Sequence, residues 1–233
     1  MSLLNSIVTD ENIEVQEERV STGGGGYKIT ESGSNLFKIN MVNIIESQHG
    51  AIGVKIQLET EEGKKLTQTE YITNRDKQSY YIDKKTNAKK ELPGYSKICA
   101  LNYLVNGVWG LPTVSEREIK EYDYDARQEV SVRREVAVDM VGKAIGGCVT
   151  VWMEDSYKDK SKPVTKVEVS HFYDPVTNKF ASEKKANKEP EMIVTFNEVA
   201  EKTPVKDKRE MSKGVATTTT ASASGVTSAN VGF

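Results

Sequence analysis

The chain has 233 residues, of which 37% are hydrophobic and 28% are charged, and its formal net charge is -2 at pH 7. A chain of this length buries one good core with appendages, or two small domains. Because the net charge is close to zero, the chain is not a general polycation, and any nucleic-acid contact must come from local segregation of charge.

Residues 1–26 are predicted to form an acidic, flexible arm. The stretch from Asp10 to Val20 contains five acidic residues and one arginine, a net charge of -4, and the arm ends in the glycine run Gly23–Gly26. We interpret this run as a hinge, because no Gly-Lys-Ser/Thr sequence follows it to bind a nucleotide. An acidic arm beside a basic surface can compete with nucleic acid for that surface.

Strands are predicted from Leu36 onward, where apolar and polar residues begin to alternate. The clearest strand is Ile52–Glu59, in which every second residue is apolar, and the run Phe37–Ile45 precedes it. A third strand, Leu66–Thr73, completes a meander and places Tyr71 on its polar face. The turns between these strands are expected at Gln48–Gly50 and Glu61–Gly63.

The segment Lys64–Lys90 interleaves aromatic and basic side chains. Proteins that bind single-stranded nucleic acid combine flat rings, which stack on bases, with cations that follow the phosphates. The candidate contacts in this segment are Tyr71, Arg75, Lys77, Tyr80, Tyr81, Lys84, Lys85, Lys89 and Lys90. The alternative is a solvated hairpin whose lysines only keep the protein soluble.

The second half of the chain begins with one short predicted helix within Tyr95–Gly107, where apolar residues recur at helical spacing. An acidic connector, Glu116–Asp125, follows. Further strands are predicted at Val130–Met140, Cys148–Glu154, Lys166–Tyr173 and Met192–Phe196. A turn containing Gly142, Gly146 and Gly147 is expected to join the first two of these strands into a hairpin. Arg134 falls on an apolar phase, which indicates a bulge or a sheet edge.

Trp152 alternates with the core residues Val151 and Met153, so its ring is expected to face outward. The ring is then either a stacking platform for a base or is covered by the extension that follows Ser156. The loop after this strand contains Lys158 and Lys160, which would extend the same binding surface.

The predicted order of three meandering strands, a helix and two hairpin strands is that of an OB-fold, a small Greek-key barrel that binds oligonucleotides. We therefore predict a mostly β protein, with an OB-fold-like domain at residues 27–203 that has one capping helix and a strand extension. A two-sheet sandwich is the alternative architecture. Residues 204–233 are predicted to form a disordered, low-complexity tail, because Thr, Ala, Ser and Gly dominate it without periodicity.

Three features resemble the OB-fold single-stranded DNA-binding proteins of tailed bacteriophages. They are the element order from about Leu36 to Tyr173, the aromatic and basic segment Tyr80–Lys97, and a tail whose last residue is Phe233. The resemblance implies coating of single-stranded DNA in the host cytoplasm during replication or recombination, with the tail recruiting replication proteins. The chain departs from this family in its tail, because Ser212–Phe233 contains no acidic residue.

Catalysis is the minority hypothesis, and no metal or cofactor site is predicted. The histidines His49 and His171 lie on different predicted elements, and His171 shares the apolar phase of its strand. The cysteines Cys99 and Cys148 follow no metal or redox spacing, and we interpret both as buried residues in a reducing compartment. The acids of Glu116–Asp125, which a metal-dependent nuclease would need, have no defined spacing.

Two further expectations concern location and the remaining function class. No apolar run is long enough to cross a membrane and the N-terminal residues lack a positively charged targeting segment, so a cytoplasmic protein without a membrane partner is expected. A phage or bacterial structural or assembly module without a nucleic-acid role is the main alternative to DNA binding, ahead of a metal-dependent nuclease.

Overall fold

The computed structural model describes residues 2–6, 29–123, 127–157, 159 and 162–209. Its strands are β1 (Gly33–Glu46), β2 (Ile52–Thr60), β3 (Lys65–Tyr71), β4 (Tyr80–Ile82), β5 (Lys89–Glu91), β6 (Ser115–Asp123), β7 (Gln128–Val136), β8 (Ala144–Asp155), β9 (Pro163–Tyr173) and β10 (Lys206–Asp207). Its helices are α1 (Pro93–Asn106), α2 (Ala181–Ala186) and α3 (Glu191–Lys202), with short 3-10 helices at Leu3–Ser6 and Val138–Met140. The protein is therefore mostly β, as predicted.

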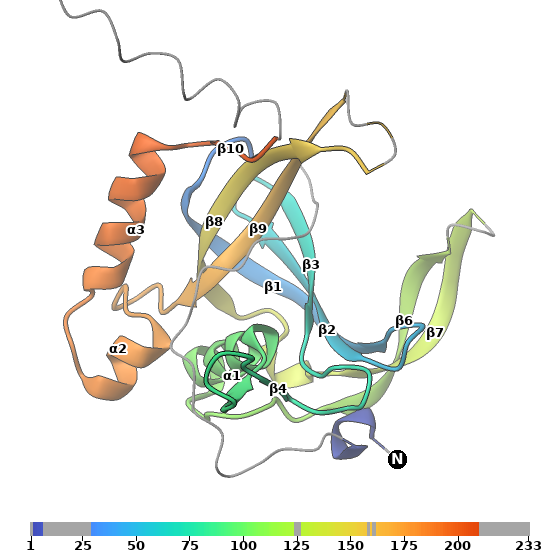
Figure 1. The fold of residues 1–233 in the computed structure, drawn as a ribbon. Coiled ribbons are helices and arrows are strands. Elements are labelled where there is room, and N and C mark those ends of the chain that lie inside the picture. Colours follow the sequence, from blue (N-terminus) through green and yellow to red (C-terminus); the bar gives the residue numbers. More distant parts are fainter. Residues whose placement is uncertain (1, 7–28, 124–126, 158, 160–161, 210–233) are drawn as a thin grey trace, which may run out of the picture.

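All strands except β4 and β5 belong to one large, mostly antiparallel sheet (Figure 1). Strand β1 pairs with β2 along one edge, and with β8 and β7 along the other. Strand β2 pairs with β3, and β8 pairs with β9. The predicted three-strand meander is confirmed, because β1, β2 and β3 are neighbours in the sheet.

The inner face of β2 supplies part of the core. Ile52, Val54, Ile56 and Leu58 are each at most 1% exposed, so the alternation predicted for this strand is confirmed. Helix α1 packs Ile98 and Leu101 into the same core. It begins with Pro93, whose fixed φ suits the first turn, and Gly107 caps it with a φ of 76°, so the predicted helix is also confirmed.

The sheet curls until β3 lies beside β9, and polar side chains join the two strands. The backbone N–H of Val169 on β9 donates to Gln68 Oε1 at 2.9 Å, and Gln68 Nε2 donates to the Val169 carbonyl at 3.3 Å. Lys97 Nζ, from α1, donates to Glu70 on β3 and to Glu168 on β9, both at 2.7 Å. We call this buried junction of two strands and a helix the β3–β9 seam.

The electrostatics of the seam hold Lys97 in its charged form. Burial alone would lower the pKa of this ammonium group, but the carboxylates of Glu70 and Glu168 outweigh burial and raise the pKa above its ordinary value. The two partners thus compensate for the removal of a cation from water.

The hairpin predicted for Val130–Met140 and Cys148–Glu154 is wrong. Strand β7 pairs along its length with β6, and β8 pairs with β1 and β9. The segment Glu116–Asp125, predicted as a connector, contributes most of β6. Its many charges hid the strand, because pairing with β7 rather than burial holds it in place.

Two of the glycines assigned to that turn lie within β8 instead. A Cβ atom on Gly146 would lie 2.2 Å from the Tyr173 ring, and one on Gly147 would lie 2.8 Å from the Phe37 ring. These glycines therefore make room for aromatic rings on the sheet. Gly142 alone adopts a turn conformation, with a φ of 82°.

The strand predicted at Met192–Phe196 is also wrong, because these residues lie in α3. Met192, Ile193, Phe196 and Ala200 follow helical spacing, and Ile193 packs in a cluster with Cys148, Tyr173 and Phe180. Helices α2 and α3 lie beside β8 and β9, while the β6–β7 hairpin projects from the other side of the molecule (Figure 1).

The structure also alters the predicted domain boundaries. Strand β10 pairs with β8 at Trp152 and Met153, so the ordered sheet extends past the boundary predicted at residue 204. At the other end, Leu3–Ser6 forms a 3-10 helix within the predicted arm. Residues 7–28, which include the rest of that arm and its glycine run, and residues 210–233 of the tail lie outside the described residues.

Replacing Lys97 with methionine should destabilise the protein by about 3–5 kcal/mol at pH 7, because two buried carboxylates would lose their counter-ion. Adding Glu70→Gln and Glu168→Gln should restore most of the loss. Urea unfolding followed by circular dichroism measures both changes. Equal stability of wild type and Lys97→Met would show that the seam contributes nothing.

The raised pKa of Lys97 also predicts a pH dependence. The contribution of the Lys97 charge to the free energy of unfolding should be complete below the pKa of about 10.4 that lysine has in the unfolded chain. It should be lost as pH rises through the higher pKa of the folded state. The difference in unfolding free energy between wild type and Lys97→Met should therefore fall in alkaline solution, as Lys97 loses its proton. A decline between pH 6 and 9 would contradict this assignment.

Candidate nucleic-acid interface

Tyr71 lies on the outer face of β3 and is 48% exposed. Its neighbours Ile72 and Glu70 are buried, whereas Thr67 and Thr69 share its side of the strand. The prediction that Tyr71 points to the polar face is confirmed. A large ring so exposed on a sheet face has the geometry that base stacking needs.

Two glycines lie close to Tyr71, one against its ring and one against its backbone. Gly53 on β2 pairs directly with Tyr71, and a Cβ at Gly53 would lie 3.3 Å from the Tyr71 Cδ1 and 3.1 Å from the Thr69 methyl. The missing side chain lets the ring approach the β2 backbone. On the inner side, a Cβ at Gly94 of α1 would lie 2.3 Å from the Tyr71 carbonyl oxygen. Tyr71 is thus held closely from both strand and helix.

The basic side chains of the segment Lys64–Lys90 differ in how they are engaged. Lys77 Nζ lies 3.3 Å from Glu46, and Lys90 Nζ lies 2.9 Å from Asp83, whose pKa it lowers. Lys89 Nζ lies 4.9 Å from the centre of the Tyr80 ring. Among the candidate cations of this segment, Arg75, Lys84 and Lys85 are exposed.

The two tyrosines of β4 behave differently from each other. Tyr81 is 38% exposed, whereas Tyr80 is only 9% exposed. The expectation that Tyr80 offers an open face is therefore wrong, because the short β4–β5 hairpin turns this ring inward, with Lys89 beside it.

Trp152 faces outward from β8, but it is only 1% exposed, so the stacking interpretation is wrong. Lys208 Nζ lies 4.2 Å from the centre of the Trp152 ring, and Trp152 Nε1 donates a hydrogen bond to Glu154 at 2.9 Å. The chain around β10 therefore covers this tryptophan, which was the alternative expectation. Lys158 and Lys160 lie outside the described residues.

The β6–β7 hairpin contributes residues that sequence reasoning did not select. Glu121 on β6 receives hydrogen bonds from Arg134 on β7, at 2.9 and 3.2 Å, and lies 3.5 Å from Lys55 Nζ on β2. Burial alone would raise the pKa of Glu121, but Arg134 and Lys55 outweigh it and lower the pKa. Lys55 was visible on the polar phase of β2, and Arg134 was visible as a cation on an apolar phase.

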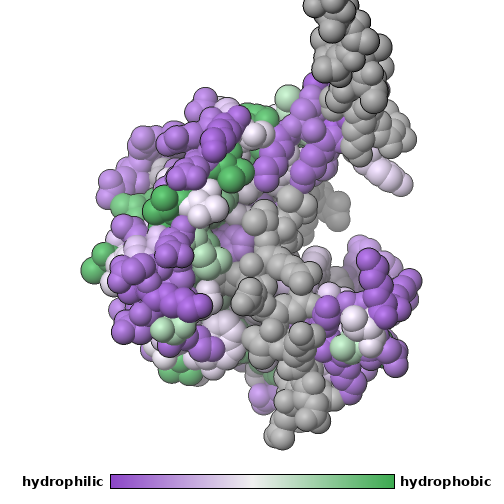
Figure 2. All heavy atoms as spheres, turned by 60° about the vertical axis from the view of Figure 1, so that its left-hand side comes forward, coloured by the Kyte–Doolittle hydropathy of each residue, from purple (hydrophilic) through white to green (hydrophobic). Residues whose placement is uncertain are grey.

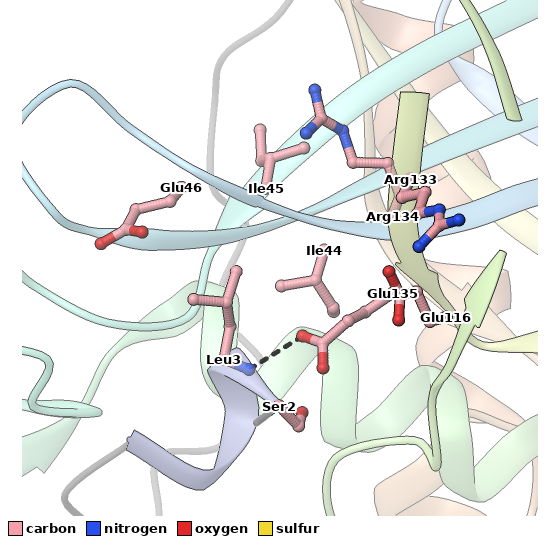
Figure 3. Close-up of a pocket in the computed structure, with 9 residues that line it drawn as sticks. All are labelled: Ser2, Leu3, Ile44, Ile45, Glu46, Glu116, Arg133, Arg134 and Glu135. Carbon is pink, nitrogen blue, oxygen red and sulfur yellow. Dashed lines mark hydrogen bonds between the residues drawn. The ribbon is translucent and has the colours of Figure 1, made fainter. Parts of the chain in front are cut away.

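A cavity of about 610 Å³ lies at the base of this hairpin (Figure 3). Its lining residues are Ser2, Leu3, Ile44, Ile45, Glu46, Glu116, Arg133, Arg134 and Glu135. The Leu3 backbone N–H donates to Glu135 at 2.9 Å and so fixes the first 3-10 helix against β7. With three carboxylates and two guanidinium groups, the lining does not favour a polyanion.

The face on the side of α2 and α3 is mainly hydrophilic, with hydrophobic residues in small separate patches (Figure 2). The exposed valines Val194 and Val199 of α3 are examples. A broad apolar surface, which marks many protein-docking sites, is not seen on the described part of this face.

Two groups with catalytic potential, Cys99 and His171, are buried. Burial raises the pKa of the Cys99 thiol to about 12, and the charge of Glu91 acts in the same direction. His171 is 5% exposed and stacks on Phe180 with ring centres 5.5 Å apart. Among the described residues, no group of three or more His, Cys, Asp or Glu side chains is placed to hold a metal ion.

Comparison of the sequence with protein-family models and with curated proteins finds no match in either. Within the described part of the chain, no helix is both long enough and apolar enough to span a membrane.

The support of Tyr71 by Gly53 can be tested by Gly53→Val. The added methyl groups would occupy the space of the ring, so Tyr71 should turn into solvent and the protein should lose roughly 1–3 kcal/mol of stability through overpacking. Ring-current shifts of the Ile45 and Thr69 methyl groups in NMR spectra report the ring position. Gln57→Val, on the same face of β2, should leave these shifts unchanged.

Proposed function

We propose that this protein is an OB-fold-like single-stranded DNA-binding protein. The connectivity supports the fold assignment: β1 pairs with both β2 and β8, β9 follows β8 in an antiparallel pair, and α1 lies in sequence between β3 and β8. The approach of β3 to β9 at the seam would complete a five-stranded Greek-key barrel. In this assignment the β6–β7 hairpin is an insertion, and α2, α3 and β10 form the extension.

The observation that carries the functional proposal is the exposed Tyr71 ring on the outer face of β3. OB-folds bind oligonucleotides on the face of their second and third strands and on the adjoining loops. Tyr71 lies on the corresponding strand here, and Gly53 leaves space for its ring against β2. We infer that one base stacks on the free side of this ring.

Phosphates would be held by the exposed cations Arg75, Lys84 and Lys85. Arg75 lies in the loop after β3, and the two lysines lie at the tip of the β4–β5 hairpin. Tyr81, which is partly exposed on the same hairpin, is a second candidate for stacking. Because charge and rings rather than base-edge contacts make up this surface, the proposed binding has little sequence preference.

The proposed role is coating of single-stranded DNA during replication or recombination, without catalysis. It agrees with the expectation from the resemblance to phage single-stranded DNA-binding proteins. Recruitment of replication proteins by the tail that ends in Phe233 stays a prediction. A structural module with no nucleic-acid role is the competing hypothesis, and binding measurements separate the two.

The proposal predicts that replacing a stacking ring and replacing a cation have different effects on DNA affinity and on its salt dependence. Tyr71→Ala should weaken binding to oligo(dT) by roughly 1–3 kcal/mol with little change in salt dependence, because stacking releases no counterions. Lys84→Ala combined with Lys85→Ala should make the slope of log K against log salt shallower by up to about 1.4, at about 0.7 per phosphate contact. Fluorescence anisotropy of a labelled oligonucleotide measures both quantities.

Tyr122→Ala is the matched control, because this tyrosine is 52% exposed but lies on β6 on the phase opposite to Glu121. It should bind like wild type. If Tyr71→Ala and the double lysine variant also bind like wild type, the interface lies elsewhere. Absence of wild-type binding at low salt would favour the structural-module hypothesis.

A further inference from the structure

We propose that Glu121 is an internal substitute for a phosphate group, and that single-stranded DNA displaces it from Lys55 and Arg134. This inference rests on the proposed function and assigns a further phosphate site to the same surface. It also gives the β6–β7 hairpin the role of a flap that is latched in the absence of DNA.

The geometry of Glu121 is that of an anion held by two cations from different elements. Its Oε2 accepts hydrogen bonds from both Nε and Nη2 of Arg134, and its Oε1 lies 3.5 Å from Lys55 Nζ. A guanidinium fork and an ammonium group are the donors that proteins use to bind phosphate oxygens. A phosphate could therefore take the place of this carboxylate with the same partners.

The site is close to solvent and to the proposed stacking residue. The Lys55 and Arg134 side chains are 29% and 39% exposed, and ion pairs of this kind stabilise a fold only weakly, so a competing anion can exchange with the carboxylate. Lys55 projects from the same face of β2 as Gly53, which pairs with Tyr71. A DNA strand with a base stacked on Tyr71 would thus bring its phosphate backbone towards Lys55.

The hairpin is attached to the rest of the sheet at a narrow base. Nine residue pairs join β6 to β7, but only one pair in register, Asn43 with Val136, joins β7 to β1. Such a ribbon can move as a unit about its base, because little sheet pairing must be broken. The contacts of Glu121 then determine where the hairpin rests.

Asn43 gives a second, independent observation. Its side chain is fully buried on the outer side of β1, in register between Lys55 and Val136. Among the described residues, neither its amide oxygen nor its amide nitrogen has a hydrogen-bond partner. Burying an unbonded amide is unfavourable. The joint between β1 and β7 therefore carries a local cost, which weakens the attachment of the hairpin.

The test compares Glu121→Gln with Glu118→Gln. In wild type the Glu121 carboxylate still competes with phosphate for Lys55 and Arg134, so these two cations contribute less than two full contacts. Glutamine keeps a hydrogen-bond acceptor for Arg134 but removes the charge, so both cations become fully available to two phosphates. For Glu121→Gln the slope of log K against log salt for oligo(dT) should be steeper than wild type by up to about 1.4. If the two proteins bind equally at 1 M salt, this difference in slope means that Glu121→Gln binds up to about 25-fold more tightly than wild type at 0.1 M salt.

Glu118→Gln makes the same change of charge on the same strand, but on its opposite and exposed face. It should leave the slope close to that of wild type. Adding Arg134→Gln to Glu121→Gln should remove about half of the gain, a change in slope of about 0.7. Circular dichroism confirms that each variant is folded.

The outcomes separate the two proposals. If wild type binds oligo(dT) and both glutamine variants change the slope equally, the effect is one of net charge; the latch is then wrong and the proposed function stands. A Glu121→Gln variant that binds like wild type also overturns the latch. If wild type and every variant fail to bind at low salt, both proposals fall.

Discussion

The buried cation at the β3–β9 seam is the interaction on which the rest of the structure depends. Lys97 reaches from α1 to carboxylates on two strands that are far apart in the sequence, and so fixes the helix and the curl of the sheet together. Its effect extends to the outer surface. Because side chains alternate along a strand, holding Glu70 inside fixes the next residue, Tyr71, on the outside. The same contact that closes the interior therefore orients the exposed ring.

Local patterns predicted those elements in which each residue's own chemistry decides its place. Strand β2 and helix α1 are examples, since period-two and helical spacing of apolar residues mark their buried faces. The pairing of β8 was not predictable in this way, because its glycines look like a turn until the rings of Phe37 and Tyr173 are placed over them. Likewise, β6 is a strand only because β7 lies beside it. Helix α3 was not predicted because the short stretch Met192–Phe196 does not reveal its helical spacing, which is recognisable only when the sequence is followed to Ala200.

Two aromatic residues that alternation places on the outer face of the sheet differ in their exposure. Tyr71 and Trp152 both face away from the core, as the sequence predicts. Tyr71 stays exposed, whereas Trp152 is covered by Lys208, which lies 56 positions later in the chain. A strand's periodicity tells which side a residue faces, but not what else packs on that side. The Glu121 network was hidden for the same reason, since it joins three strands whose proximity only the tertiary structure shows.

The narrow attachment of the β6–β7 hairpin has a mechanical consequence. Nine paired residues make a ribbon about 30 Å long, so a rotation of about 10° at its base displaces the far end by about 5 Å. The hairpin thus behaves as a cantilever, in which a small rotation near Asn43 and Val136 becomes a large displacement at the far end of the paired ladder. Its stiffness is set at the joint with β1, where one residue pair and the hydrogen bond from the Ala137 N–H to the Val42 carbonyl hold it, rather than by the long ladder between β6 and β7. A second residue pair at that joint would change how far the ribbon swings without altering any residue along its length.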